Sequence, residues 1–374
     1  MLKKIAALVM CALLTLSLSS CSNATNLSDM SVAQGVSVDY DGAMTRVCVQ
    51  YLDLAKGTAT ADGVDSNITS VAGGEGDNVS LAVSKASAGL TGPVFFGQNK
   101  IIVFGTAFAE SGLDGISNYA LRSIDSRPDV LVALCDGSGE EVIHSKQENA
   151  KVPAQSVYDM IKTGERVGLS VCVSVNDLLN MYNDPTSDVY LPCLGVKDDK
   201  AVCGGIMIFS GEKPAALLDD RESFGFLLMN NLIKGGTLNV YDEKLGSVGF
   251  EIKSAKIKKS ASYSGSQINF DSELKLKLIL NNTQKGIAVK TDKADISRLE
   301  ALAADEVEAL CASCIKKCFA SRSDVFSLGR MLAKSDSASY NALKNNWHDM
   351  LSGAEYKLNA RCSIELISDS SLKE

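Results

Sequence analysis

The sequence predicts an α+β protein of more than one domain, in which mixed sheets pack against helices. Three observations support this fold class. The chain has 374 residues, which is long for a single hydrophobic core. Its first half alternates between strand-like and helix-like segments, whereas its second half is rich in strands first and in helices later. With 45% hydrophobic residues, 22% charged residues and 6 prolines, the composition is that of a folded chain over most of its length.

Residues 1–20 have the features of a secretory signal peptide that is removed on export. Lys3 and Lys4 precede a largely apolar run over residues 5–18. This run is shorter than the roughly 20 residues that a membrane-spanning helix needs, and no later run in the sequence reaches that length. The mature chain is therefore not expected to be a transmembrane protein.

The end of this segment predicts a lipid anchor. Leu18-Ser19-Ser20-Cys21 places an apolar residue and two small residues before a cysteine, which is the lipobox pattern of bacterial lipoproteins. In that class the cysteine thiol receives a diacylglyceryl group, and two acyl chains give stable attachment to a bilayer. Cys21 is the predicted lipidation site, and residues 21–34 are the lipidated cysteine and a tether. Ordinary cleavage beside an incidental cysteine is the alternative.

Residues 35–190 are predicted to form an N-terminal α/β module of one or two subdomains. Alternating apolar residues on both sides of Asp41-Gly42 predict a β-hairpin over residues 35–54. The Gly-rich stretch at residues 72–78 lacks the Lys-Ser/Thr of a phosphate-binding loop, so a flexible loop is expected within a polar connection. The other expected elements are helices at 79–90, 113–122, 153–162 and 175–182, strands at 100–104 and 129–134, and an acidic, turn-forming boundary at 183–200.

Residues 200–370 are predicted to form a C-terminal α+β domain, a strand-rich sheet covered by long helices. The clearest strand is residues 272–280, in which leucines alternate with charged residues, the pattern of a strand with one buried face. Further strands are expected at 201–209 and 237–252, followed by helices at 295–319, 324–333 and 338–351 and by a final strand at 355–367.

The stretch CASCIKKC, residues 311–318, raises the question of a metal site. A zinc site needs four ligands, and cluster ligation needs loop backbone, yet the surrounding sequence lacks glycine and proline and is rich in helix formers. On that helix, residues at steps of three and four form one apolar stripe: Leu299, Ala303, Val307, Leu310, Cys314 and Cys318. Helix packing is the prediction, with a metal site and a disulfide as alternatives; no metal site or cofactor is predicted.

Charge and residue content weigh against two function classes. Removing Lys3 and Lys4 from the 37 basic residues leaves 35 basic against 45 acidic residues. This surplus of negative charge argues against binding to nucleic acid and against electrostatic attachment to anionic lipid through a polybasic segment. The chain has 2 histidines, His144 and His348, each beside polar or charged residues, so solvated surface positions are expected. Neither a Gly-x-Ser-x-Gly elbow nor an HExxH helix occurs. An enzyme is not predicted.

Several short motifs carry a resemblance in their order and spacing. They are an apolar strand running from Gly35 to Asp39, a central segment from Lys100 through Gly105 and Gly112 to Arg122, and a C-terminal segment with Asp324, Gly329 and Trp347. This arrangement resembles the Ger(x)C family, the lipoprotein C subunits of nutrient germinant receptors in endospore-forming bacteria. Ser22-Asn23, Gln98 and Ser123 depart from the usual family pattern, which indicates a divergent member.

Each motif residue also has a physical interpretation. Gly105 and Gly112 suit turns or positive φ at the ends of elements. Asp324 suits the start of a helix, where an acceptor or a negative charge is stabilising. Trp347 is the single tryptophan, and an anchor in the core is expected. Lys100 and Arg122 are candidates for structural or partner contacts.

The resemblance implies a non-enzymatic subunit, anchored by lipid on the outer face of the spore inner membrane. It implies two integral-membrane partner subunits, one of them permease-like, with which the chain responds to a small nutrient and triggers ion and dipicolinate release. The first alternative is a solute-binding lipoprotein of a transporter, which would have two similar α/β lobes. The second is an anchored hydrolase, which would need a nucleophile and a base.

Overall fold

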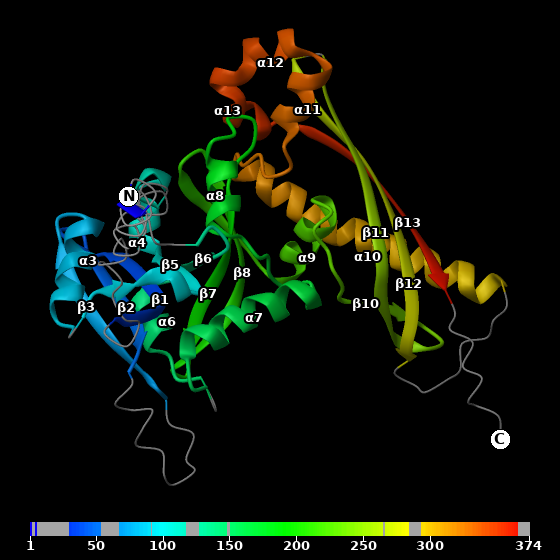
Figure 1. Cartoon of the computed structure of the whole chain (residues 1–374). Helices are drawn as coiled ribbons and strands as arrows, with labels where there is room; N and C mark the ends of the chain where they lie inside the picture. Colours follow the sequence, from blue (N-terminus) through cyan, green and yellow to red (C-terminus); the bar gives the residue numbers. More distant parts are fainter. Residues whose placement is uncertain are drawn as a thin grey trace, which may run out of the picture.

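A computed structural model of the chain describes residues 30–53, 67–90, 92–116, 127–147, 150–264, 266–283 and 293–365, together with residues 1, 4 and 5. The predicted lipidation site Cys21 lies outside the described residues, as do most of the predicted signal peptide and tether. Arg122 also lies outside them. The predicted α+β class is confirmed, because two separate sheets carry helices on their faces (Figure 1).

The first sheet occupies the N-terminal part of the chain and has the strand order β3-β2-β1-β5-β6-β7-β8-β9, with β4 beside β1. Its centre is parallel, from β1 through β5 and β6 to β7, and antiparallel hairpins flank that centre on both sides. The strands are β1 (Ser31–Tyr40), β2 (Thr45–Leu52), β3 (Thr69–Gly76), β4 (Val94–Phe95), β5 (Ile101–Gly105), β6 (Leu131–Cys135), β7 (Tyr190–Lys197), β8 (Lys200–Ser210) and β9 (Lys213–Leu218).

Helices cover both faces of this sheet, which explains why its central strands are apolar throughout. Every residue of Ile101–Gly105 and of Leu131–Cys135 is buried. Ile102 and Phe104 belong to one hydrophobic core, whereas Ile101 and Val103 pack in a second core with residues of α7. The helices are α3 (Val79–Ala88), η2 (Phe96–Gln98), α4 (Thr106–Glu110), α6 (Gly139–His144), α7 (Pro153–Val167), α8 (Val175–Tyr182) and α9 (Asp220–Met229).

The second sheet is antiparallel except at one edge and has the order β10-β11-β12-β13. The predicted alternation is confirmed, since Leu274, Leu276 and Leu278 of β12 are buried and the lysines between them are exposed. Strand β13 joins β12 in parallel. The elements are β10 (Thr237–Asp242), β11 (Gly246–Ser264), β12 (Gln267–Thr283), α10 (Lys293–Ala320), α11 (Leu328–Ser335), α12 (Ser337–Leu343), η3 (Lys344–Asn346), α13 (Trp347–Leu351) and β13 (Glu355–Glu365).

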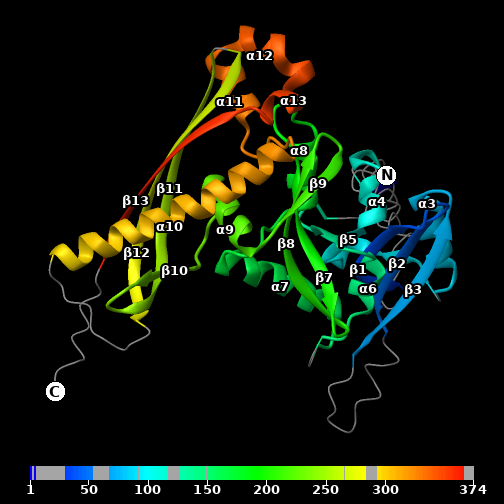
Figure 2. The ribbon, with the colours of Figure 1, turned by 180° about the vertical axis from the view of Figure 1, so that it is seen from behind.

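Helix α10 lies across one face of the second sheet, as Figure 2 shows from behind. Its predicted apolar stripe is confirmed, because Leu299, Ala303, Val307, Leu310, Cys314 and Cys318 are all buried. Cys311 is buried beside them. The sulfur atoms of Cys314 and Cys318 lie 3.9 Å apart as free thiols. Burial raises the pKa of Cys314 well above its ordinary value, which fits an apolar packing role.

Two stretches that were expected to be loops are strands. Residues 69–76 of the Gly-rich connection form the edge strand β3, paired with β2. Gly74 allows α3 to pack against this strand, since a Cβ there would lie 2.2 Å from the backbone oxygen of Ala82. Residues 190–197, in the stretch expected to form turns, are strand β7 near the middle of the large sheet. The residue composition of these two stretches does not predict that either would pair as a strand.

The large sheet also continues further along the chain than the expected boundary at residues 190–200. Strands β8 and β9 pair with β7 and with each other, so the large sheet ends at Leu218. The sequence placed this segment with the C-terminal strands. The division into domains at residues 190–200 stays a prediction.

Helix α9 has no counterpart among the expected elements. A capping box begins it, in which Asp219 and Glu222 exchange backbone and side-chain hydrogen bonds. All residues from 222 to 229 are buried, so the helix lacks the polar face that periodicity detects.

Within the part of the chain that the structure describes, no helix has the length and apolar character needed to cross a membrane.

Candidate functional site

Three of the motif residues meet at one buried carboxylate. Asp324 lies in the turn between α10 and α11 and is 1% exposed. Its Oδ1 accepts a hydrogen bond from the Leu328 N–H (2.7 Å), and its Oδ2 accepts from the Gly329 N–H (2.7 Å) and from Trp347 Nε1 (2.9 Å). The predicted helix start is therefore shifted from residue 324 to Leu328, and Asp324 supplies the acceptor for its first N–H groups.

Gly329 and Trp347 fit this turn for steric reasons. A Cβ at Gly329 would lie 3.0 Å from the backbone oxygen of Thr186, so the glycine lets α11 approach the segment before β7. Trp347 is 5% exposed, which confirms the predicted core anchor. Its ring packs edge-on against Tyr340 at 5.8 Å between centroids. The Tyr340 hydroxyl donates to the backbone oxygen of Pro185.

Asp188 links this cluster to the large sheet. It precedes β7, and its Oδ2 accepts from the Asp324 N–H (2.6 Å), while the Asp188 N–H donates to the Asp324 carbonyl (3.1 Å). Its Oδ1 accepts from the Gly211 N–H in the turn between β8 and β9 (2.9 Å). His348 Nε2 lies 3.0 Å and 3.1 Å from the two carboxylate oxygens. Asp188 thus joins the large sheet to the turn between α10 and α11. We call the cluster of Asp188, Asp324, Trp347 and His348 the inter-sheet joint.

Burial controls the electrostatics of the inter-sheet joint. Desolvation raises the pKa of Asp324 to about 7, although its three hydrogen-bond donors work in the opposite direction. The hydrogen bond with Asp188 raises the pKa of His348. Burial lowers the pKa of Lys259 to about 8, and its Nζ donates to Asn230 Oδ1 (3.2 Å) and to the Phe326 carbonyl (3.1 Å). His348 is therefore a paired, half-exposed residue, whereas the sequence predicted a solvated one.

A groove of about 460 Å³ opens beside the inter-sheet joint. Its polar lining includes Asp184, Asp188, Glu212, Lys344 and His348. Asp184 is also paired with Arg330 of α11. The carboxylates of Asp188 and Asp324 already accept several hydrogen bonds from the chain itself, so their arrangement serves to hold elements together. It does not present a free nucleophile and base.

A second carboxylate organises the N-terminal motif residues. Asp39, at the end of β1, accepts from the N–H groups of Gly139 (2.7 Å) and Glu140 (3.0 Å), the first residues of α6. A Cβ at Gly105 would lie 2.2 Å from Asp39 Oδ1. Gly105 has a φ of −70°, so the reason for glycine is this close approach and not a positive φ. Burial raises the pKa of Asp39.

The remaining described motif residues lie apart from both carboxylates. A Cβ at Gly35 would lie 2.7 Å from the Ala154 Cβ, so this glycine makes room for the start of α7. Gly112 has a φ of +117°, as predicted for the end of an element. The Lys100 N–H donates to the Gln34 carbonyl. The sequence thus named Asp39, Asp324 and Trp347 but did not predict which residues would meet, and it missed Asp188, whose partners are distant in the chain.

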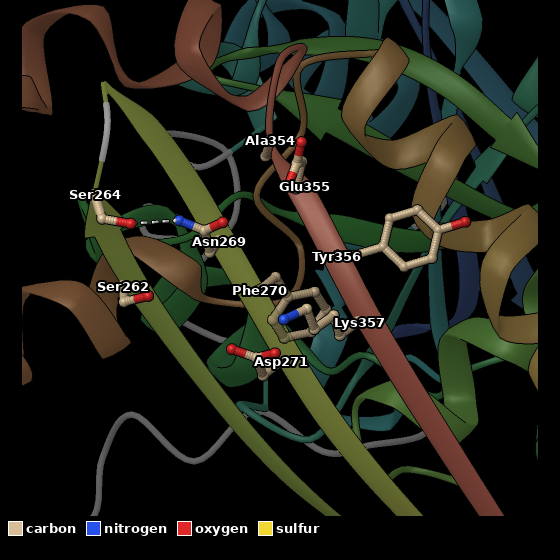
Figure 3. A pocket seen from close by; sticks show the side chains of 9 residues that line it. All are labelled: Ser262, Ser264, Asn269, Phe270, Asp271, Ala354, Glu355, Tyr356 and Lys357. Carbon is tan, nitrogen blue, oxygen red and sulfur yellow. Dashed lines mark hydrogen bonds between the residues drawn. The ribbon is translucent and has the colours of Figure 1, made fainter.

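The second sheet carries a pocket that the sequence did not suggest. Figure 3 shows it at one end of β11, β12 and β13, where Ser264 and Asn269 are joined by a hydrogen bond (3.1 Å). Its volume is about 550 Å³. Asp271 and Lys357 lie opposite each other in the register of β12 and β13, both exposed. These are ordinary surface contacts of a solvated sheet face and do not indicate a reaction.

Both halves of the chain match models of known families. Residues 23–196 match the model described as the spore germination protein N-terminal domain, and residues 204–367 match the one described as spore germination B3/GerAC like, C-terminal. This chain belongs to the Ger(x)C family. The resemblance carried by the motifs is thereby confirmed. The two Ger(x)C models meet at the hairpin between β7 and β8 of the large sheet.

Individual Ger(x)C relatives are distant. The chain is 24% identical over 173 residues to spore germination protein GerQC of Bacillus cereus, which is 46% of this chain and 47% of the relative. The match therefore spans about half the length of that relative. The crystal structure of the GerBC protein is similar with a TM-score of 0.59 and 19% identity, covering 89% of this chain and 98% of GerBC. At that identity the likeness to GerBC concerns the fold.

Proposed function

We propose that this chain is the lipid-anchored, non-enzymatic C subunit of a membrane germinant receptor and is needed for nutrient-triggered spore germination. The observation that carries the proposal is that family models of spore germination proteins match both halves of the chain. The lipobox at Cys21 supports the anchor, and an exported chain anchored by lipid would lie on the outer face of the spore inner membrane. Its partners would be two integral-membrane subunits.

The inter-sheet joint supports a role in assembly and signal coupling. Its buried carboxylates take hydrogen bonds from the turn between β8 and β9, from the turn between α10 and α11 and from α11, so the C-terminal helices are held against the large sheet. A subunit that transmits a conformational change from one partner to another needs such a rigid connection, because a flexibly linked domain would move independently of the rest of the chain. These hydrogen bonds also support a non-enzymatic role, since the carboxylates of Asp188 and Asp324 already accept bonds from the chain itself.

The two sheets differ in strand order and in direction of pairing. A solute-binding lipoprotein was expected to have two similar lobes, and this difference gives that alternative no support. The groove beside the inter-sheet joint has a mixed lining that includes Asp188 and Asp324, and internal partners occupy much of the hydrogen-bonding capacity of these two carboxylates. We therefore keep the receptor subunit as the proposed function.

The test is germination of spores that depend on this receptor alone. Cys21→Ala removes the proposed acyl attachment, and Cys11→Ala, in the predicted signal peptide, is the matched control. We expect Cys21→Ala spores to lose germination with nutrient while responding normally to exogenous dipicolinate, and the chain to leave the membrane fraction. Cys11→Ala spores should germinate with both triggers. Normal nutrient germination of Cys21→Ala spores would overturn the proposal.

A further inference from the structure

Three side chains of different chemistry converge beside β2, the strand next to the edge strand β3 of the large sheet, away from the inter-sheet joint. They are the thiol of Cys48 in β2 and two side chains of α6, the carboxylate of Glu140 and the imidazole of His144. One sulfur, one oxygen and one nitrogen atom from these residues lie within 4.8 Å of one another. The sequence predicts a solvated surface position for His144.

The fold positions all three groups from rigid elements. Cys48 lies opposite Ser37 of β1 and opposite Gly73 of β3 in the sheet register. Glu140 and His144 are one helical turn apart, which places them on one face of α6 with 3.7 Å between Glu140 Oε1 and His144 Nε2. The Asp39 carboxylate holds the first turn of α6 against β1. The positions of the three side chains are therefore set by a strand and a helix and do not depend on a loop.

A groove adjoins two of the three donors. Cys48 is 3% exposed, whereas the side chains of Glu140 and His144 are 33% and 53% exposed. A groove of about 610 Å³ reaches both Cys48 and Glu140. Gly73 also lines it, and a Cβ at this position would lie 3.7 Å from the Cys48 sulfur, so the missing side chain leaves the approach open. Water could fill the fourth position from this side.

The charges around the three groups have to be considered together. Burial and the neighbouring Glu140 raise the pKa of the Cys48 thiol to about 12, so a bound cation would have to displace its proton. The thiolate and the Glu140 carboxylate would then balance a divalent cation, with His144 neutral. Arg46 is the main opposing charge, because it lies 3.7 Å from Glu140; its closer partner is Glu75 at 2.8 Å. Lys85 also lines the groove.

We propose that Cys48, Glu140 and His144 bind one divalent transition-metal ion of the zinc class, with water as the fourth ligand. Zinc prefers sulfur, nitrogen and carboxylate oxygen donors in tetrahedral sites, and three protein ligands with one open position are a known arrangement. Hard cations such as Mg²⁺ and Ca²⁺ prefer oxygen donors, so a thiolate disfavours them. The proposal is independent of the germination role.

Cobalt(II) is the probe, since a thiolate–cobalt site absorbs in the near ultraviolet and a tetrahedral one in the visible. The detergent-solubilised full chain, reduced and stripped of metal, is titrated with Co²⁺ and then with Zn²⁺. We expect one equivalent of Co²⁺ to produce both absorptions and one equivalent of Zn²⁺ to remove them. The same titration with Mg²⁺ should leave the spectrum unchanged.

Variants assign the ligands. Cys48→Ser should abolish the near-ultraviolet absorption, and His144→Ala should weaken Co²⁺ binding about tenfold or more. Cys172→Ser and His348→Ala are the matched controls and should retain the wild-type spectrum. Arg46→Gln should strengthen binding several-fold, because it removes the opposing charge, and this gain cannot result from misfolding. A chain that gives no cobalt spectrum, or a spectrum that survives both Cys48→Ser and His144→Ala, would overturn the proposal.

Discussion

The indole N–H of Trp347 donates a hydrogen bond of 2.9 Å to the buried carboxylate of Asp324, across 23 residues of sequence. The same oxygen accepts from the Gly329 N–H, so α13 and the start of α11 share one acceptor. Asp324 in turn donates its backbone N–H to Asp188, beside the large sheet. This relationship ties α11 and α13 to the segment before β7 of the large sheet, and it brings the motif residues Asp324, Gly329 and Trp347 into one cluster.

Trp347→Phe should destabilise the protein. Phenylalanine keeps most of the buried ring but leaves the buried Asp324 carboxyl without one donor, and the loss of such a buried partner costs about 1–3 kcal/mol. Urea unfolding followed by circular dichroism measures the loss in the free energy of unfolding. Tyr340→Phe is the control, because its hydroxyl bonds a backbone oxygen at the surface, and we expect a change below about 1 kcal/mol. Equal losses in both variants would contradict the assigned role of Asp324.

Gly105→Ala should disrupt the contact between β5 and Asp39. The added Cβ would lie 2.2 Å from Asp39 Oδ1, so the carboxylate would have to leave the N–H groups of α6. We expect a loss of about 2–4 kcal/mol, the sum of overpacking and lost hydrogen bonds. Gly89→Ala is the matched control, since its φ of −83° is also negative and the nearest atom lies 3.8 Å away. A neutral Gly105→Ala variant would argue against this close approach.

The stabilising contribution of His348 should decrease as pH rises. The Asp188 carboxylate raises the pKa of His348 above 6.5, so protonation favours the folded state. This contribution is complete below pH 6.5 and is lost as pH rises through the raised pKa. Asp324 and Asp349 also face this histidine and act in the same direction. The difference in unfolding free energy between wild type and His348→Gln, measured from pH 5 to 9, should therefore be largest at the acidic end.

Asp188→Asn provides the control for this pH dependence. Its amide oxygen can still accept a hydrogen bond, but the negative charge next to His348 is gone. In this background the effect of His348→Gln should change much less between pH 5 and 9. A pH dependence of unchanged size would show that another group is responsible.

Cys314→Val and Cys318→Val should both be tolerated. Each thiol is fully buried on the apolar stripe of α10, and valine changes volume and polarity little, so we expect less than about 1.5 kcal/mol for each. Cys314→Asn is the contrasting variant, because an amide without partners in this core should cost about 1–3 kcal/mol or more. Thermal unfolding measures the difference. Cooperative unfolding that is lost in the valine variants would point to a role for the thiols beyond packing.

Local patterns in the sequence determined several elements of this protein correctly. Strand β12 and helix α10 each place their buried residues at a regular spacing that follows directly from backbone geometry, and the β1–β2 hairpin turns at Asp41-Gly42 as predicted. The order of short motifs was enough to indicate the Ger(x)C family. Gly112 was expected at a positive φ and has one. All these features depend on residues close together in sequence, or on their order along the chain.

Only the tertiary structure decided which of these pieces meet. Strands β3 and β7 are held by pairing with β2 and with β6 and β8, and α9 is hidden from periodicity because it is buried on nearly all sides. The meeting of Asp324 with Asp188, and of Cys48 with α6, joins residues about a hundred positions or more apart. The spacing of residues along the chain fixes local geometry, but such contacts depend on how whole elements pack, since no short stretch of sequence contains both partners.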